Sequence, residues 1–226
     1  MDSSLYKTLV MKNLQVLFFL FCITVALLSC GQHFQQPEPK KPQKDLSKYS
    51  QATFASGCFW CVETVFESVK GVEEAVSGYA GGKEANPTYQ QVGAHQTGHA
   101  ETVQVYYDSS VVSYATLLKV YFASEDPTQV NGQGPDQGTP YRSIIFYRTP
   151  GEKMQAEKYI AEIQKNYSSP IAAQVVPFEK FWEAEDYHQD YIVHNPDVPY
   201  VRMESMPRIR RFQKQYPDLI KPDHKF

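Results

Sequence analysis

Two cysteines, Cys58 and Cys61, have the residue type and the spacing for thiol redox chemistry. They stand in the segment Ser-Gly-Cys-Phe-Trp-Cys-Val of residues 56–62, where a strand pattern passes through glycine into a helical pattern. The unpaired amides at a helix start favour a thiolate, so we expect a lowered pKa and a nucleophilic sulfur at Cys58. Positions three apart on a helix lie about 5–6 Å from each other, within reach of a disulfide. The pair can therefore alternate between dithiol and disulfide.

An inert structural disulfide is the alternative for this pair. A disulfide that closes so short a loop removes little entropy from the unfolded chain, so it would stabilise the fold only weakly. Phe59 and Trp60 could likewise be ordinary core residues. Val62 and Phe66 already supply the buried face of the helix, however, so we expect Trp60 to form the wall of an apolar substrate pocket.

Alternating strand and helix patterns must position these side chains. Residues 51–55 are predicted to form a strand, and apolar residues at helical spacing then predict a helix that ends at Gly71. Ser113 and Thr149 each have the residue type and the position of a helix N-cap. The other predicted strands cover residues 72–79, 99–107, 142–147 and 172–178. The order βαββαβ, followed by one more helix and one more strand, predicts an α+β fold with ferredoxin-like pairing.

The first 50 residues differ in composition from the rest of the chain. Residues 1–29 place lysines before an apolar stretch shorter than the roughly 20 residues of a membrane span, as in a signal peptide, and Met11 is an alternative start. The end of this stretch, Leu-Leu-Ser followed by Cys30, resembles a bacterial lipoprotein signal, in which the cysteine is lipidated and becomes the N-terminus. An uncleaved helical anchor is the alternative. Residues 30–50 are rich in proline and lysine, as in a tether.

These features predict an exported catalytic domain, residues 51–226, anchored through lipid in a bacterial cell envelope and facing the periplasm. The hydrophobic content of 42% predicts a packed core. The net charge of −3 gives no electrostatic reason to expect nucleic acid as a partner. We expect a monomer.

Seven short segments resemble the motifs of one known enzyme family, the A-type peptide methionine sulfoxide reductases. Gly-Cys-Phe-Trp at residues 57–60 is similar to the catalytic motif of that family. The other segments follow in family order, and they are Ser-Gly-Tyr-Ala-Gly-Gly (77–82), Asn-Pro-Thr-Tyr (86–89), Thr-Gly-His-Ala-Glu (97–101), Asp-Pro-Thr-Gln (126–129), Tyr-Arg-Ser (141–143) and Ala-Glu-Asp-Tyr-His-Gln (184–189). The resemblance covers most of the chain after residue 51.

The resemblance implies reduction of the S epimer of methionine sulfoxide, in proteins or as the free amino acid, without a metal or a cofactor. Cys58 would attack the sulfoxide sulfur, methionine would leave, and a sulfenic acid would remain on Cys58. Cys61 would condense with that acid to form a disulfide, which a thioredoxin-like donor would reduce. Phe59 and Trp60 would hold the substrate methyl group by apolar burial.

Glu101 is the candidate acid that protonates the sulfoxide oxygen. Strand alternation places it on the same face as Val103 and Val105, so burial should raise its pKa and keep it neutral. A solvated glutamate at a strand end is the alternative, and the resemblance favours the acid. It also implies that Tyr89 and Tyr141 are neutral donors to the same oxygen, and that Asp136 is a polar support near the substrate.

The chain departs from the family pattern at several positions. The family often has glycine at the position of Cys61 and a resolving cysteine near the C-terminus, whereas this chain has no cysteine after Cys61. If Cys22 is cleaved away and Cys30 is acylated, Cys61 is the partner left for Cys58. Gly132 and Pro140 stand where arginine and glutamine are frequent, which affects the loop around Asp136.

Three other functions fit parts of the sequence. A thioredoxin-like disulfide oxidoreductase also has Cys-x-x-Cys at a helix start, but Trp60 lies between these cysteines instead of before them. A metal site would need Cys58 and Cys61 together with His95 and His99, across a spacing far longer than that of compact zinc sites. A surface lipoprotein that binds a partner through aromatic residues would leave the cysteine pair unexplained. His99 and His188 are expected in the framework, and Arg208 to Arg211 on the solvated face of a terminal helix.

Overall fold

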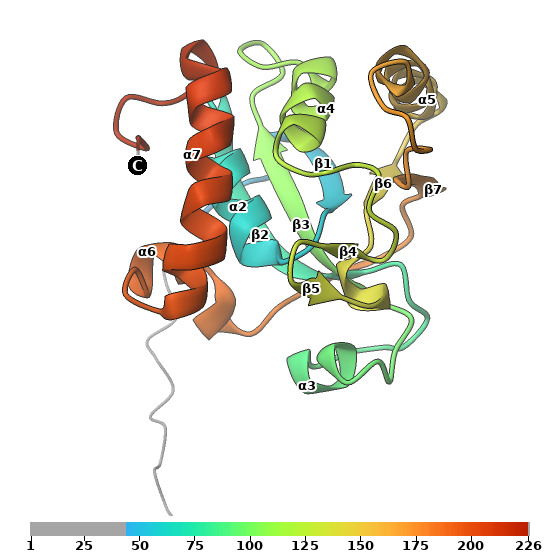
Figure 1. Ribbon diagram of the computed structural model, residues 1–226, viewed down its shortest axis with the longest axis vertical. Helices are drawn as coiled ribbons and strands as arrows, with labels where there is room; N and C mark the ends of the chain where they lie inside the picture. Colours follow the sequence, from blue (N-terminus) through green and yellow to red (C-terminus); the bar gives the residue numbers. More distant parts are fainter. Residues whose placement is uncertain (1–43, 226) are drawn as a thin grey trace, which may run out of the picture. The chain divides into compact units, whose positions relative to one another are not determined.

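A six-stranded sheet with the strand order β7-β6-β1-β3-β2-β8 forms the centre of the computed structural model (Figure 1). The structure describes residues 44–225, so the expected signal peptide, Cys30 and most of the tether lie outside it. The strands are β1 (Ser50–Ala55), β2 (Val72–Ala80), β3 (Ala100–Tyr107), β6 (Ile144–Tyr147), β7 (Gln174–Pro177) and β8 (Phe181–Glu183). Neighbouring strands are antiparallel except for β6 and β7, which are parallel.

The four central strands confirm the predicted ferredoxin-like pairing. Their order, β6-β1-β3-β2, with every neighbour antiparallel, is the arrangement that a βαββαβ chain produces. The additional helix and strand predicted after this unit are α5 (Pro150–Gln164) and β7. Strand β8 was not predicted; it extends the other edge of the sheet, where Trp182 pairs with Tyr79 of β2.

Two helices of the core begin where the sequence predicts. α2 (Phe59–Glu67) packs on β2 and β3, and α4 (Tyr114–Ala123) packs beside α2 and α5. The Ser113 hydroxyl accepts a hydrogen bond from the Thr116 amide at 3.1 Å, and the Thr149 hydroxyl accepts one from the Glu152 amide at 3.1 Å. Both side chains therefore satisfy an amide that the helix itself leaves unpaired.

The aromatic core fixes the end of β1 against these helices. The ring of Phe54 stacks on Phe66 of α2 at a centroid distance of 5.1 Å and lies 5.3 Å from the ring of Tyr121 in α4. The Tyr121 hydroxyl donates to the carbonyl of Ala55 at 3.0 Å. These contacts hold the strand end from which the chain turns into α2, so they place the cysteines with little freedom.

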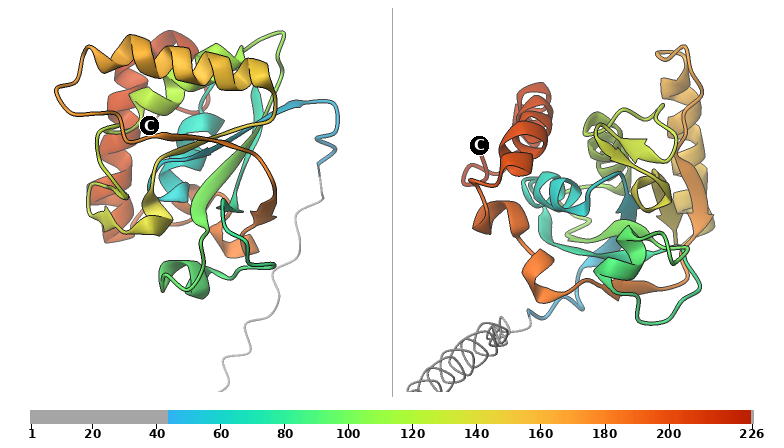
Figure 2. Two further views of the ribbon diagram at one scale, coloured as in Figure 1. Left: turned by 90° about the vertical axis from the view of Figure 1, so that its right-hand side faces the viewer. Right: turned by 60° about the horizontal axis from the view of Figure 1, so that its bottom comes forward.

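The C-terminal segment returns to the same helix. The short helix α6 (Tyr191–His194) is followed by the π-helical turn η3 (Val201–Ser205) and by α7 (Met206–Gln215), which packs across α2 (Figures 1 and 2). Short elements complete the site side of the fold, namely α3 (Tyr89–Gly93), β4 (Gly132–Gln133), β5 (Asp136–Gln137) and the 3-10 turns η1 (Thr139–Tyr141), η2 (Asp186–His188) and η4 (Pro217–Leu219). None of the helices within residues 44–225 combines the length and the apolar character needed to cross a membrane.

Candidate active site

Cys58 occupies the N-cap position of α2, as the sequence predicts. Gly57 turns the chain at this point with a φ of 71°, and a Cβ atom there would lie 2.6 Å from Cβ of Gln133. Both the backbone conformation and the close neighbour therefore favour glycine. The turn directs Cys58 inward, and both Cys58 and Cys61 are free and buried.

The substrate-side residues predicted from the sequence surround one cavity of about 170 Å³. They come from α2, α3, β3, β5 and η1, elements far apart in the chain. The lining residues are Cys58, Phe59, Trp60, Tyr89, Glu101, Asp136, Tyr141 and Tyr200. Tyr200 was not predicted, and nothing in the sequence distinguishes it from the other tyrosines.

Glu101 lies on β3 with its carboxyl group against the start of α2. Its side chain is only 2% exposed, and Oε2 accepts a hydrogen bond from the Phe59 amide at 3.0 Å. Burial raises the pKa of Glu101 to about 8, in the direction expected from the sequence; the Phe59 hydrogen bond opposes this shift and the nearby Asp136 and Cys61 reinforce it. The carboxyl group is therefore neutral at pH 7 and can donate a proton into the cavity.

The pKa of the Cys58 thiol is shifted in the direction opposite to the one expected from the sequence. Burial raises the pKa of the Cys58 thiol well above its usual value. A hydrogen bond from Cys58 lowers the pKa of Cys61 to about 6, and Arg208 and Ser205 contribute to the same shift. The main reason for the shift at Cys58 is the burial of its side chain, and the neighbouring Cys61 and Glu101 act in the same direction. The reduced site therefore favours a thiolate on Cys61 over one on Cys58.

Trp60 is held by two side chains from the C-terminal part of the chain. Its ring stacks on Tyr191 with centroids 3.7 Å apart and planes 8° apart, and its Nε1 donates to His188 Nδ1 at 3.0 Å. Burial lowers the pKa of His188 to about 4, which keeps the imidazole neutral and able to accept this hydrogen bond. The indole is thus fixed as an apolar wall of the cavity, as the sequence predicts, and His188 belongs to the framework around it.

Tyr89 and Tyr141 present neutral phenols to the cavity. A capping box between Thr88 and Gln91 starts α3 at Tyr89, whose amide also donates to Glu185 Oε1 at 3.0 Å. Tyr141 ends the turn η1. Burial raises the pKa of both phenols, so each keeps its proton and can donate a hydrogen bond without adding charge to an apolar site.

Asp136, in the two-stranded hairpin of β4 and β5, lines the same cavity as these phenols. Its Oδ2 accepts a hydrogen bond from the Tyr200 hydroxyl at 2.6 Å. Its role as a polar support beside the substrate stays a prediction. The departure at Gly132 has a local cause, since a Cβ atom there would lie 2.7 Å from the Asp136 carbonyl oxygen. Pro140 is placed at the start of η1, where its fixed φ suits the turn.

A second cavity, of about 330 Å³, adjoins the first. Cys61 and Arg208 line it, and Asp136 and Tyr200 line both cavities. The two cysteines therefore line different cavities, Cys58 the aromatic one and Cys61 the one lined by Arg208 of α7.

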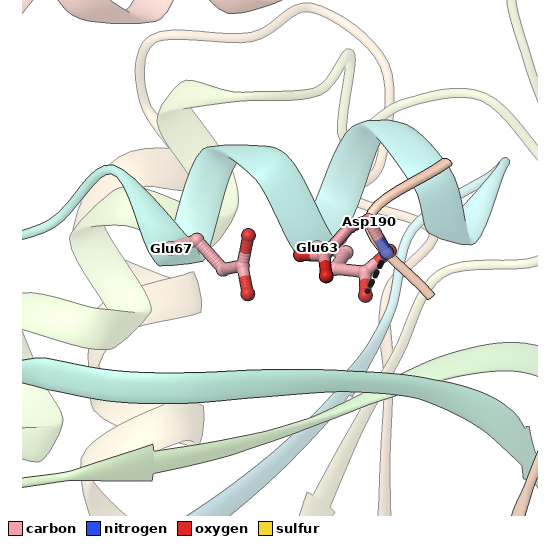
Figure 3. A group of neighbouring side chains, drawn as sticks. All are labelled: Glu63, Glu67 and Asp190. Atoms are coloured by element: carbon pink, nitrogen blue, oxygen red, sulfur yellow. Dashed lines mark hydrogen bonds between the residues drawn. The ribbon is translucent and has the colours of Figure 1, made fainter. Parts of the chain in front are cut away.

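Within residues 44–225, one group of three side chains has its possible metal-ligand atoms close enough together to hold a metal ion, and all three are acidic. It consists of Glu63 and Glu67 of α2 together with Asp190 (Figure 3). Glu63 already accepts hydrogen bonds from the Ser77 hydroxyl at 3.0 Å and the Asp190 amide at 3.1 Å. The set of Cys58, Cys61, His95 and His99 is not brought together, and the ring of His99 is instead bonded to the backbone of Gly82 and Glu84.

Comparisons with known proteins agree on one family. The family model of peptide methionine sulfoxide reductase matches residues 50–219. The chain is 46% identical over 174 residues to peptide methionine sulfoxide reductase MsrA 2 of Synechocystis sp., covering 76% of this chain and 81% of the relative. Among solved structures it resembles reduced Mxr1 from Saccharomyces cerevisiae, with a TM-score of 0.65, 32% identity and coverage of 72% of this chain and 94% of that one. Methionine sulfoxide reductase A of Corynebacterium diphtheriae gives a TM-score of 0.62, 30% identity and coverage of 74% and 86%.

Proposed function

Because this chain belongs to the peptide methionine sulfoxide reductase family and reduces methionine sulfoxide with thiols, we propose that it acts on the S epimer through Cys58, Cys61 and Glu101. The observation that carries this proposal is the single cavity in which a buried cysteine, a neutral carboxyl group and aromatic walls meet. Family membership also argues against the thioredoxin-like, metal-binding and partner-binding alternatives.

In this proposal each side of the cavity receives a different part of the substrate. The sulfoxide methyl group lies against Phe59 and Trp60, where apolar burial favours it over polar groups. The sulfoxide oxygen points toward Glu101, with the phenols of Tyr89 and Tyr141 as further donors. The sulfur then faces Cys58.

Reduction proceeds in two steps that consume both thiols. Cys58 attacks the sulfoxide sulfur, passes its thiol proton to the Cys61 thiolate, and the sulfoxide oxygen takes a proton from Glu101. The S–O bond of the substrate breaks, its oxygen is transferred as a hydroxyl group to the Cys58 sulfur to give a sulfenic acid, and methionine leaves with the electron pair. Cys61 then attacks the Cys58 sulfur, the S–O bond breaks, and the oxygen leaves as water. Methionine sulfoxide and two thiols thus yield methionine, water and one disulfide.

A thioredoxin-like dithiol is the proposed donor that restores the two thiols. Within residues 44–225 the cysteines are Cys58 and Cys61 alone, so the oxidised domain holds one short-range disulfide. Direct exchange with an external dithiol returns it to the reduced form without a relay through a third cysteine.

Turnover of the separated sulfoxide epimers tests this function. We expect methionine to form from the S epimer of free and peptide-bound methionine sulfoxide in the presence of thioredoxin, and the R epimer to remain unchanged. Methionine measured by chromatography gives both rates. Equal rates for the two epimers, or turnover of the R epimer alone, would contradict the proposal.

We also propose that the enzyme is an exported, monomeric lipoprotein on a membrane of a bacterial cell envelope, facing the periplasm. The support is the sequence of residues 1–50, in which a short apolar stretch ends at Cys30 and a proline- and lysine-rich segment follows.

Lipid labelling tests this localisation. Cells that express the full chain are expected to incorporate a labelled fatty acid into the protein, and Cys30→Ala should remove the label and release the protein from the membrane fraction. Cys22→Ala is the matched control, because that cysteine lies in the segment expected to be cleaved. Label retained in Cys30→Ala would exclude this site of lipidation.

A further inference from the structure

The C-terminal helical segment supplies two polar side chains to Cys61. Cys61 Sγ lies 3.2 Å from the hydroxyl oxygen of Ser205, the last residue of η3. Arg208 follows three residues later on α7, so it lies on the same helical face and lines the second cavity together with Cys61.

Hydrogen bonds to Ser56 and Ser124 hold the Arg208 guanidinium in place. Its Nη2 donates to the carbonyl and the hydroxyl oxygens of Ser56, each at 3.0 Å, and its Nε donates to the Ser124 carbonyl. Ser56 lies two residues before Cys58, and Ser124 ends α4. The positive charge is therefore held beside the cysteine turn and not displayed on a solvated helix face, as the sequence had suggested.

The charges around Cys61 come from several elements. Cys58 faces it from the start of α2, Asp136 from β5, Glu101 from β3, and Tyr200 from the residue before η3. Asp136 disfavours a thiolate on Cys61, whereas Arg208 and Ser205 favour one. Glu125, Glu204 and Arg211 also line the second cavity with Cys61. Among the groups that shift the pKa of Cys61 most, Arg208 is the cation.

We propose that Arg208 and Ser205 are positioning residues that hold Cys61 as a thiolate aimed at the sulfenic acid on Cys58, and so drive disulfide formation. The inference rests on the proposed roles of the two cysteines. Cys61, protonated when Cys58 attacks the substrate, returns this proton to the Glu101 carboxylate. The Cys61 thiolate then forms the S–S bond, the S–O bond breaks, and Glu101 protonates the departing oxygen to give water.

Titration of Cys61 in a Cys58→Ser background tests the electrostatic part. The thiolate absorbs in the ultraviolet, so its formation can be followed against pH without any substrate. Arg208→Gln is expected to move the midpoint upward by at least about one pH unit. The midpoint of Arg208→Lys should lie between those of the Cys58→Ser parent and Arg208→Gln. Arg210→Gln is the matched control, because Arg210 is exposed on the same helix, and its midpoint should not move. An unchanged midpoint in Arg208→Gln would overturn the inference.

The rate of disulfide formation tests the catalytic part. In enzyme with both cysteines, one equivalent of sulfoxide produces the sulfenic acid, and dimedone trapping follows its disappearance. At pH 6.5 Arg208→Gln should slow this step by about tenfold, and the rate should recover as the pH rises and Cys61 ionises unaided. A loss that is the same at every pH would indicate a merely structural effect and would count against the inference.

Two further measurements separate the possible failures. Arg208→Gln could fail to fold, because it loses its bonds to Ser56 and Ser124. Ser205→Ala removes only a hydroxyl group, so it should raise the titration midpoint of Cys61 by less than Arg208→Gln does. If the midpoint stays unchanged in both Ser205→Ala and Arg208→Lys, the inference is wrong. If the wild type forms no sulfenic acid on Cys58, the proposed function is wrong; if it does and the variants resolve it as fast, only this inference is wrong.

Discussion

Replacing Cys58 with serine is expected to abolish methionine formation, with a loss of kcat/KM of about 10³-fold or more. A serine hydroxyl at this position would be a far weaker nucleophile toward sulfur, and it cannot form the sulfenic acid through which the oxygen leaves the substrate. The substitution is nearly isosteric in a buried site, so the unfolding midpoint should change little. Chromatographic measurement of methionine released from the S epimer, with thermal unfolding alongside it, checks both statements.

Cys61→Ser is the matched variant, because it changes the neighbouring sulfur and spares the nucleophile. It should still release close to one methionine per enzyme without a reductant, since Cys58 alone receives the oxygen, although more slowly because the thiolate that accepts the Cys58 proton is missing. Steady-state turnover with thioredoxin should then be poor. If wild type and Cys61→Ser turned over equally fast with thioredoxin, Cys61 would not be the resolving thiol.

Local signals in the sequence were sufficient for the longer helices and strands, including α2 and β3, but not for the short elements α3, β5 and η1, which carry Tyr89, Asp136 and Tyr141. The caps at Ser113 and Thr149 depend on contacts within four residues, and both form as predicted. The strand that carries Glu101 forms as predicted, and Glu101 is buried together with Val103 and Val105, although the residues between them are buried as well. The pairing of four strands in ferredoxin-like order follows from the order of the elements and the handedness of their connections.

Contacts between distant segments could not be predicted in the same way. Tyr200, Ser205 and Arg208 reach the cysteines only because the chain after β8 folds back across α2, and no spacing in the sequence marks that return. The shift of the Cys58 pKa was predicted in the wrong direction for a related reason. A helix start does favour an anion, but here the burial of the Cys58 thiol outweighs that effect.

Replacing Glu101 with glutamine is the second change with a large expected effect, a loss of about 10² to 10⁴-fold in the rate of sulfoxide reduction. The amide oxygen of glutamine can still accept the Phe59 hydrogen bond, so the start of α2 should persist. Glutamine cannot give a proton to the sulfoxide oxygen, however. Single-turnover rates with the S epimer measure the chemical step without the recycling steps that follow it. An undiminished rate between pH 6 and 8 would exclude Glu101 as the acid.

Glu63→Gln is the matched control, because Glu63 is also a buried glutamate with a pKa raised by burial, yet it lies outside the cavity and bonds to Ser77 and Asp190. Its rate of sulfoxide reduction should stay close to that of the wild type. Loss of a buried carboxyl group as such would slow both variants, whereas loss of the acid would slow Glu101→Gln alone.

The pH dependence of the reduction rate and of the stability provides an independent test of Glu101. With a pKa of about 8, Glu101 is protonated below pH 8, so the wild-type rate of reduction should fall as the pH rises through 8. Because folding raises this pKa, the stability that the neutral carboxyl group confers is complete below its unfolded pKa and is lost as the pH rises through 8. Glu101→Gln should therefore lose less stability than the wild type between pH 6 and 9, while its low rate should vary little over the same range. A wild-type rate and stability that both stay flat to pH 9 would mean that the carboxyl group is already ionised in the folded protein and that the proton comes from elsewhere.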